Sequence, residues 1–280
     1  HMDRNVNEKS AFNKQVDMLP LFAGGADDVQ GAVRRIAAEE LGVREEEIFG
    51  MDLYLYNRMQ PSVWGKDGEF LSAPRLDDLQ CAYTSFAGFL RGADDRAVNV
   101  FACFDNEEVG SNTKQGAGST FLKDVLERIN EGLGKTREEL RRALASSFLV
   151  SCDNAHAVHP NHPEKTDQSN CVYMNEGIVI KSHAGQQYTS DAFSIAVWRG
   201  VCERAGVPVQ FFANRSDMRG GSTLGNIAMS QVSMNAVDIG LAQLAMHSSY
   251  ETAGVRDSEY MIRAVKAFFD SGICEYTLGR

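Results

Sequence analysis

The sequence has no long apolar run, no excess of positive charge and no closely spaced cysteines, and each absence excludes a class of protein. None of its 280 residues lies in a run approaching the roughly 20 apolar residues that span a bilayer. The net charge of −10 argues against nucleic acid or an anionic membrane as a partner. The start of the chain does not have the form of a signal or transit peptide.

The six cysteines are scattered, and no two form a Cys-x-x-Cys pair. Most of them lie inside apolar runs, so we interpret them as buried thiols in a reducing compartment and expect a cytoplasmic protein. No internal repeat appears. With 43% hydrophobic residues, the chain is long enough for a sizeable core, in one large domain or in one large and one small domain.

The pattern of apolar residues changes near residue 68, where we place a domain boundary. Before it, a helix is predicted from Asp27 or Asp28 to about Leu41, and alternation predicts a strand over 49–56. Residues 61–69 are predicted to be a loop. Segment 1–67 is too short and too polar for a convincing core of its own.

From Phe70 onward, short strands alternate with amphipathic helices, which is typical of an α/β sheet. Strands are predicted over 98–104, 148–150, 178–180, 208–212 and 236–239. Helices are predicted after 73–78 and through 90, then over 119–131, 136–145, 190–205 and 258–269, with a glycine-rich turn and a helix within 220–234.

The strand predicted over 98–104 ends in three acids, Asp105, Glu107 and Glu108. Charge removed from water has to be paired or bound to a metal. Ligands of open α/β sheets lie just beyond the carboxyl ends of strands. Because Glu107 and Glu108 are adjacent, they point in different directions, and one could bind a cation while the other handles a proton. A solvated acidic turn is the alternative.

Further candidate ligands follow other turns and strands. Asp77 follows a turn, Asp153 follows a strand and His247 lies in a late loop. Oxygen and imidazole ligands from several strand ends are typical of a hydrolytic zinc site, and two ions about 3.5–4 Å apart need a carboxylate between them. One of the aspartates is the natural bridge. The alternatives are that Asp77 and Asp78 cap a helix and that His247 is a surface histidine.

His156 and His159 have the i, i+3 spacing of a metal-binding pair on a helix. Pro160 follows directly and disfavours a helix before it. We therefore interpret the two histidines as contacting substrate or supporting the metal ligands, with a metal-binding pair as the alternative.

Four ordered motifs resemble the successive signatures of the M18-family metallo-aminopeptidases, the aspartyl aminopeptidases. The motifs are Arg75-Leu76-Asp77-Asp78, residues 105–111 (Asp-Asn-Glu-Glu-Val-Gly-Ser), residues 153–161 (Asp-x-Ala-His-Ala-Val-His-Pro-Asn) and residues 243–248 (Gln-Leu-Ala-Met-His-Ser), and the connecting segments 179–181 and 215–217 match as well. The resemblance implies an α/β fold: a zinc-peptidase-like three-layer α/β/α catalytic domain with a central mixed sheet over 68–280. Residues 1–67 would be the remainder of an inserted dimerisation domain.

The resemblance also implies an activity, namely the removal of N-terminal residues, Asp or Glu, from peptides through a metal-bridging water. Two divalent ions are implied, zinc first, with cobalt or manganese as alternatives. The implied roles are Asp77 as the bridging carboxylate, followed by a cis peptide bond to Asp78; Glu107 as the general base; Glu108, Asp153 and His247 as metal ligands; Lys181 as the contact for the acidic side chain of the substrate; Gly221 in a loop lining the cleft; and His156 and His159 near the substrate.

The sequence also departs from the family pattern. The family's first metal-binding histidine lies in a His-x-Asp segment that has no counterpart here, so the chain resembles the carboxy-terminal two thirds of a member. His1 either matches a histidine that reaches into a neighbouring subunit's active site or is left from cloning. The resemblance implies homodimers that assemble into a tetrahedral dodecamer. The alternatives are an M42-type tetrahedral aminopeptidase and a non-catalytic assembly subunit.

Overall fold

The computed structural model of the chain describes residues 5, 8, 11–25, 28–94, 96–218 and 220–273. The chain divides into two compact units, His1–Leu55 and Tyr56–Arg280. The division falls before the boundary expected near residue 68, and residues 62–64 already pair with a strand of the second unit.

The first unit contains the predicted helix, α1 (Val29–Leu41), and a short 3-10 turn, η1 (Glu45–Glu47). The carboxylate of Asp28 accepts a hydrogen bond from the amide of Gly31, and Gly42 ends the helix in a left-handed conformation. The strand predicted over 49–56 is wrong. These residues form no strand, and Phe49 is 96% exposed. Alternation alone cannot make a strand where no neighbouring strand accepts its backbone hydrogen bonds.

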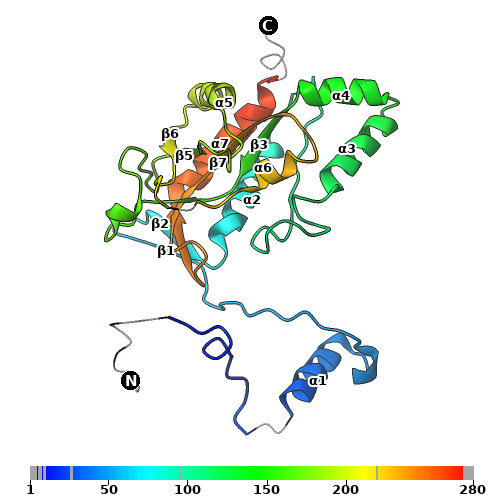
Figure 1. Cartoon of the computed structure of the whole chain (residues 1–280), viewed down its shortest axis with the longest axis vertical. Helices are drawn as coiled ribbons and strands as arrows, with labels where there is room; N and C mark the ends of the chain where they lie inside the picture. Colours follow the sequence, from blue (N-terminus) through cyan, green and yellow to red (C-terminus); the bar gives the residue numbers. More distant parts are fainter. Residues whose placement is uncertain are drawn as a thin grey trace. The chain divides into compact units, whose positions relative to one another are not determined.

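The second unit is built on two mixed sheets (Figure 1). The four-stranded sheet has the order β3-β7-β5-β6, in which β3 is parallel to β7, β7 is antiparallel to β5, and β5 is parallel to β6. Its strands are β3 (Phe148–Cys152), β5 (Ile178–Lys181), β6 (Val209–Phe212) and β7 (Asn235–Gly240). All four match predicted strands within a few residues.

The five-stranded sheet has the order β1-β2-β9-β8-β4. Its strands are β1 (Ser62–Trp64), β2 (Phe70–Ala73), β4 (Ala155–His156), β8 (Ala242–Leu244) and β9 (Glu251–Gly254). The loop predicted over 61–69 is therefore wrong in part, because β1 pairs antiparallel with β2. These strands are short, and β2 pairs with β9 from the far end of the chain, so no local pattern marks them.

The helices of the second unit confirm the predicted ones, and they cover both faces of the four-stranded sheet. On one face, α2, α5 and α7 pack on Ile178 and Ile180 of β5, with Trp198 of α5 in the same core cluster and with α7 between the other two helices (Figure 1). The short helix α6 contacts β3 and β7, and α3 packs beside α4. The bounds are α2 (Leu76–Phe89), α3 (Phe121–Gly132), α4 (Arg137–Ala145), η2 (Pro163–Lys165), α5 (Ala192–Ala205), α6 (Leu224–Ala228) and α7 (Val255–Asp270).

The strand predicted over 98–104 is wrong. The segment pairs with no strand, and Val98 is exposed. It is held through side chains instead, since the ring of Phe101 lies 5.1 Å from that of Phe86 and 6.1 Å from that of Phe89 on α2. The acidic motif that follows is thus presented by a loop packed on α2 rather than by a strand end.

The cysteines agree with the prediction only in part. The five that the structure describes are free thiols, and Cys81 and Cys202 are buried. Cys103 is exposed, because the segment that carries it is not part of a sheet. No helix in the described ranges has the length and hydrophobicity needed to cross a membrane.

Candidate metal centre

Asp77 lies at the first turn of α2, where the backbone departs from helical geometry. Arg75 has a left-handed φ of 58°, and the Asp77–Asp78 peptide bond is cis, as expected. The carboxylate of Asp77 is 6% exposed. The start of α2 therefore directs this side chain into the molecule rather than into the solvent.

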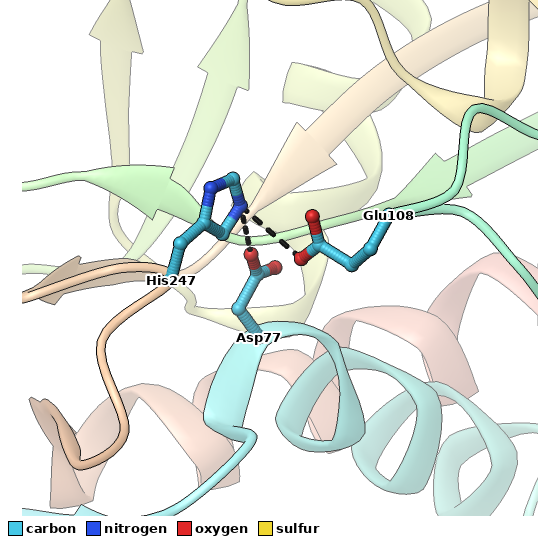
Figure 2. A group of neighbouring side chains, drawn as sticks. All are labelled: Asp77, Glu108 and His247. Carbon is cyan, nitrogen blue, oxygen red and sulfur yellow. Dashed lines mark ion pairs between the residues drawn. The ribbon is translucent and has the colours of Figure 1, made fainter. Parts of the chain in front are cut away.

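His247 and Glu108 approach Asp77 from two separate loops. His247 lies in the turn between β8 and β9 with a φ of 65°, and Glu108 lies in the turn that follows Asn106. The Nε2 atom of His247 is 3.0 Å from Asp77 Oδ2 and 3.1 Å from Glu108 Oε1. Figure 2 shows the three side chains converging from α2 and the two loops. One ligand atom from each lies within 4.8 Å of the others, so a single ion could contact all three.

A second group shares Asp77. Ligand atoms of Asp77, Asp78 and Asp153 also lie within 4.8 Å of one another. Asp153 follows β3, and its backbone amide donates to the carbonyl of Ile239 on β7 at 3.0 Å. The ammonium of Lys181, the last residue of β5, lies 3.2 Å from Asp153 Oδ2. Asp77 is thus the residue that the two groups have in common.

The crowding of acids changes their proton affinities. Burial, followed by the charges of Asp153 and Glu108, raises the pKa of Asp77 to about 8. Burial and the charges of the same two residues, Asp153 and Glu108, also raise the pKa of Glu107 to about 6. Burial disfavours the charged Lys181 ammonium, but the charges of nearby acidic groups, Asp153 first among them, outweigh burial and raise the pKa of Lys181. The centre therefore holds more carboxyl groups than its own cations can neutralise, and this crowding favours protonation.

The donor set fits a divalent metal ion. The two groups offer carboxylate oxygens and one imidazole nitrogen and no thiolate, the ligand chemistry that suits zinc in hydrolytic sites and also cobalt or manganese. In addition, Asp78 Oδ1 is buried without a hydrogen-bond partner among the described residues. A buried carboxylate oxygen left without a donor favours a cation beside it.

The structure brings together the four predicted ligands, Asp77, Glu108, Asp153 and His247. Glu107, the predicted base, is half-buried in the same turn as the neighbouring residue Glu108, and its pKa is raised by burial and by the charges of Asp153 and Glu108. Since these residues come from four different segments, their convergence depends on the whole second unit.

The remaining predicted residues do not belong to the two groups of potential metal ligands found among the described residues. His156 ends β4 and His159 lies in a loop, so they do not share a helix face, and within the described ranges neither belongs to a group of potential metal ligands. Lys181 is 3% exposed and paired with Asp153. Gly221 lies in an exposed loop. His1 lies outside the described residues.

Sequence reasoning missed two residues of the centre. Asp78 was considered only as a helix cap, yet it joins the second group of ligand atoms. Glu251, the first residue of β9, is 2% exposed and accepts hydrogen bonds from the amides of Asp77 and His247. The sequence gives no signal for Glu251, because its partners are backbone groups brought close only by folding.

A mixed-sheet α/β fold that gathers carboxylates and an imidazole at loop and helix ends is the arrangement of metal-dependent peptidases. The family model described as aminopeptidase I zinc metalloprotease (M18) matches residues 1–269. The chain belongs to the M18 family, as its motifs predicted.

Individual relatives agree with this assignment. A probable M18 family aminopeptidase 2 of Clostridium novyi is 46% identical over 272 residues, covering 96% of this chain and 63% of the relative. The crystal structure of prApe1 has a TM-score of 0.89 at 26% identity, covering all of this chain and 63% of the other. The S. cerevesiae mApe1 dodecamer has a TM-score of 0.74 at 28% identity, covering 89% of this chain and 56% of the other. The chain thus spans somewhat less than two thirds of these relatives.

Proposed function

We propose that this chain forms most of the active site of a metallo-aminopeptidase that removes N-terminal residues, preferentially Asp or Glu, from peptides. The main support for this proposal is the convergence of Asp77, Glu108 and His247. The Nε2 atom of His247 lies 3.0 Å from the carboxylate of Asp77 and 3.1 Å from that of Glu108. Membership of a family described as zinc metalloproteases supports the same chemistry.

Two ion positions follow from the two ligand groups. One ion would be held by Asp77, Glu108 and His247, and a second would share Asp77 and be held by Asp153, with Asp78 beside it. The first group has the mixed oxygen and imidazole ligands that zinc prefers, whereas the second has carboxylates only. We therefore expect the first position to bind zinc more tightly.

Bound divalent ions supply Lewis-acid chemistry: they polarise the substrate carbonyl and make a nearby water more acidic. Glu107 is the residue proposed to take the proton from the attacking water and to pass it to the leaving amine. Its raised pKa, about 6, suits a base that has to accept and return a proton near neutral pH. Its position next to the proposed ligand Glu108 in the sequence also supports this role.

The substrate contacts are proposed from the family resemblance. Lys181 would meet the acidic side chain of the first substrate residue, with His156, His159 and the loop at Gly221 along the peptide. In the structure the Lys181 ammonium is buried and paired with Asp153. A role in substrate binding therefore requires that Asp153 turn toward a metal ion and release the ammonium.

Assembly and location are proposed on the same basis. We propose homodimers that associate into a dodecamer, as in the S. cerevesiae mApe1 dodecamer, with His1, if native, reaching a neighbouring site. The free thiols among the described residues favour a reducing compartment such as the cytoplasm. Segment 1–67 is proposed to belong to the dimerisation domain.

The test is release of chromophore from N-terminal Glu and Asp anilides by the chain, with and without added Zn²⁺ or Co²⁺. The chain is assayed alone and co-expressed with the segment of the Clostridium novyi relative that it does not match. We expect turnover that depends on the added metal. The variant Glu107→Gln should reduce this turnover by a factor of about 10²–10⁴, the usual contribution of a general base, and should still bind the metal. Glu131→Gln, an exposed residue of α3, is the matched control and leaves turnover unchanged.

Absence of turnover in every combination, with the metal bound, would instead favour the non-catalytic assembly subunit. The other alternative, an M42-type peptidase, is set aside by the match to the M18 family model over residues 1–269.

A further inference from the structure

Glu251 is a buried carboxylate with an unusual pair of partners. Its Oε2 accepts from the amide of Asp77 at 2.8 Å, and its Oε1 accepts from the amide of His247 at 2.7 Å. The side chain is 2% exposed. Each oxygen is therefore occupied by the backbone of a different proposed metal ligand, and those ligands are 170 residues apart in sequence.

The position of Glu251 in the second sheet explains how it reaches both segments. It is the first residue of β9 and pairs with Ala73, the last residue of β2. The chain leaves β2 toward Asp77, and it enters β9 from the turn that carries His247. Glu251 lies where these two segments diverge, so its carboxylate closes the gap between them.

Both segments need such a restraint. Ala245 and His247 have φ values of 58° and 65°, and Arg75 before Asp77 has a φ of 58°. Left-handed backbone is unfavourable for a non-glycine residue, so these conformations persist only when neighbouring contacts impose them. Hydrogen bonds to a charged, buried acceptor are among the stronger contacts available for this purpose.

We propose that Glu251 is a positioning residue, which holds the backbones of Asp77 and His247 at the separation that metal binding by their side chains requires. This inference rests on the proposed function, because it assumes that Asp77 and His247 bind a metal ion. Glu251 itself contacts their amides and takes no part in proton transfer. Both of its oxygens have to be acceptors, since each faces an N–H group.

The test compares Glu251→Gln with the wild-type chain by competition for Zn²⁺ against a chelating dye. Gln has the same length but offers one acceptor oxygen, so one of the two amides loses its partner. We expect Zn²⁺ affinity to fall about 10- to 100-fold, the usual effect of removing a group that orients a metal ligand. With saturating Co²⁺, the visible absorption of the variant should also differ from that of the wild type, because the ligands are displaced.

Asp257→Asn is the matched control. Asp257 is also fully buried, and its carboxylate also accepts from two backbone amides, those of Asn175 and Gly177, at 2.6 and 3.0 Å. Those residues are not proposed ligands, so Asp257→Asn should leave the Zn²⁺ affinity and the Co²⁺ spectrum unchanged. Equal affinities of Glu251→Gln and the wild type would overturn the inference. So would an equal loss in both variants, which would indicate a general effect of buried charge.

Failure of the proposed function has a different signature, because the wild-type chain itself would then bind neither Zn²⁺ nor Co²⁺. If Glu251→Gln does not fold, hydrogen exchange on the wild type decides the matter. The amides of Asp77 and His247 should be protected, although His247 lies in an exposed turn. Exchange of either amide at the rate of an unstructured peptide would show that the restraint does not exist.

Discussion

Gly240, the last residue of β7, is the glycine on which the position of Asp153 depends most directly. A Cβ atom added to Gly240 would overlap the carbonyl oxygen of Asp153 and lie 3.0 Å from its carbonyl carbon. Ordinary contacts between carbon atoms are about 3.5–4.0 Å. The variant Gly240→Ala therefore has to push the two segments apart by on the order of 1 Å, since neither atom belongs to a flexible side chain.

The cost of this displacement can be worked out from the contacts it breaks. The Asp153 amide lies 3.0 Å from the carbonyl of Ile239, and a shift of that size breaks the hydrogen bond. Overpacking together with the lost bond should lower the free energy of unfolding by about 2–4 kcal/mol. Because Asp153 moves, the second proposed ion should also bind about 10- to 100-fold more weakly.

Urea denaturation and Zn²⁺ competition measure the two effects. Gly200→Ala on α5 is the control with the opposite sign. Its Cβ would lie 3.6 Å from Arg204 Nη1, in ordinary contact, and a helical Gly-to-Ala change stabilises by about 0.5–1 kcal/mol. A Gly240→Ala variant as stable as the wild type, with unchanged Zn²⁺ binding, would refute the close approach between Gly240 and Asp153.

Three other predictions concern charge, capping and the core. Burial raises the pKa of Asp257 to about 6, so the folded state binds a proton more tightly than the unfolded state between about pH 4 and 6. The wild type should therefore lose about 3 kcal/mol of unfolding free energy relative to Asp257→Asn as pH rises through this window, and equal pH profiles would contradict the shift. Thr136→Ala removes the acceptor for the Glu139 amide and should cost about 1 kcal/mol, seen as a lower urea midpoint at constant slope. Trp198→Ala, at a fully buried position on α5, should cost about 3–5 kcal/mol in the same assay, and a loss below 1 kcal/mol would contradict its burial.

The sequence predicted best where local pattern and tertiary environment agree. The helix α5 has a capping aspartate, Asp191, and ends at a left-handed glycine, Gly206, so both ends are marked by the residues themselves. The strands β5 and β7 are short apolar runs that the core requires to be buried. In each case the same residues set the local preference and make the tertiary contacts.

The predictions failed where pairing decides the structure. The apolar segment 98–104 has strand-like composition, but it lies against α2 through Phe101 and pairs with no strand. Conversely, β1 and β9 are unremarkable in sequence and become strands because β2 lies between them. A strand is defined by its neighbour, and single-sequence patterns do not identify the neighbour.

The candidate site also has residues that the local sequence marks and residues that only the folded structure identifies. Its ligands were predicted because acids that follow turns and strands need a partner, and the family motifs placed them in order. Glu251 was missed because its role depends on two backbone amides that folding brings to it. The pairing of Lys181 with Asp153 was also missed, since their distance depends on the register of both β5 and β3 against β7.

The most direct test of the metal centre is a crystal structure of the chain grown with Zn²⁺, with anomalous diffraction at the zinc edge. The structure predicts a zinc peak about 2.0–2.2 Å from His247 Nε2 and from one carboxylate oxygen each of Asp77 and Glu108. Zinc found only at other histidines, such as His159 and His162, with Asp77, Glu108 and His247 making no contact with it, would contradict the assignment.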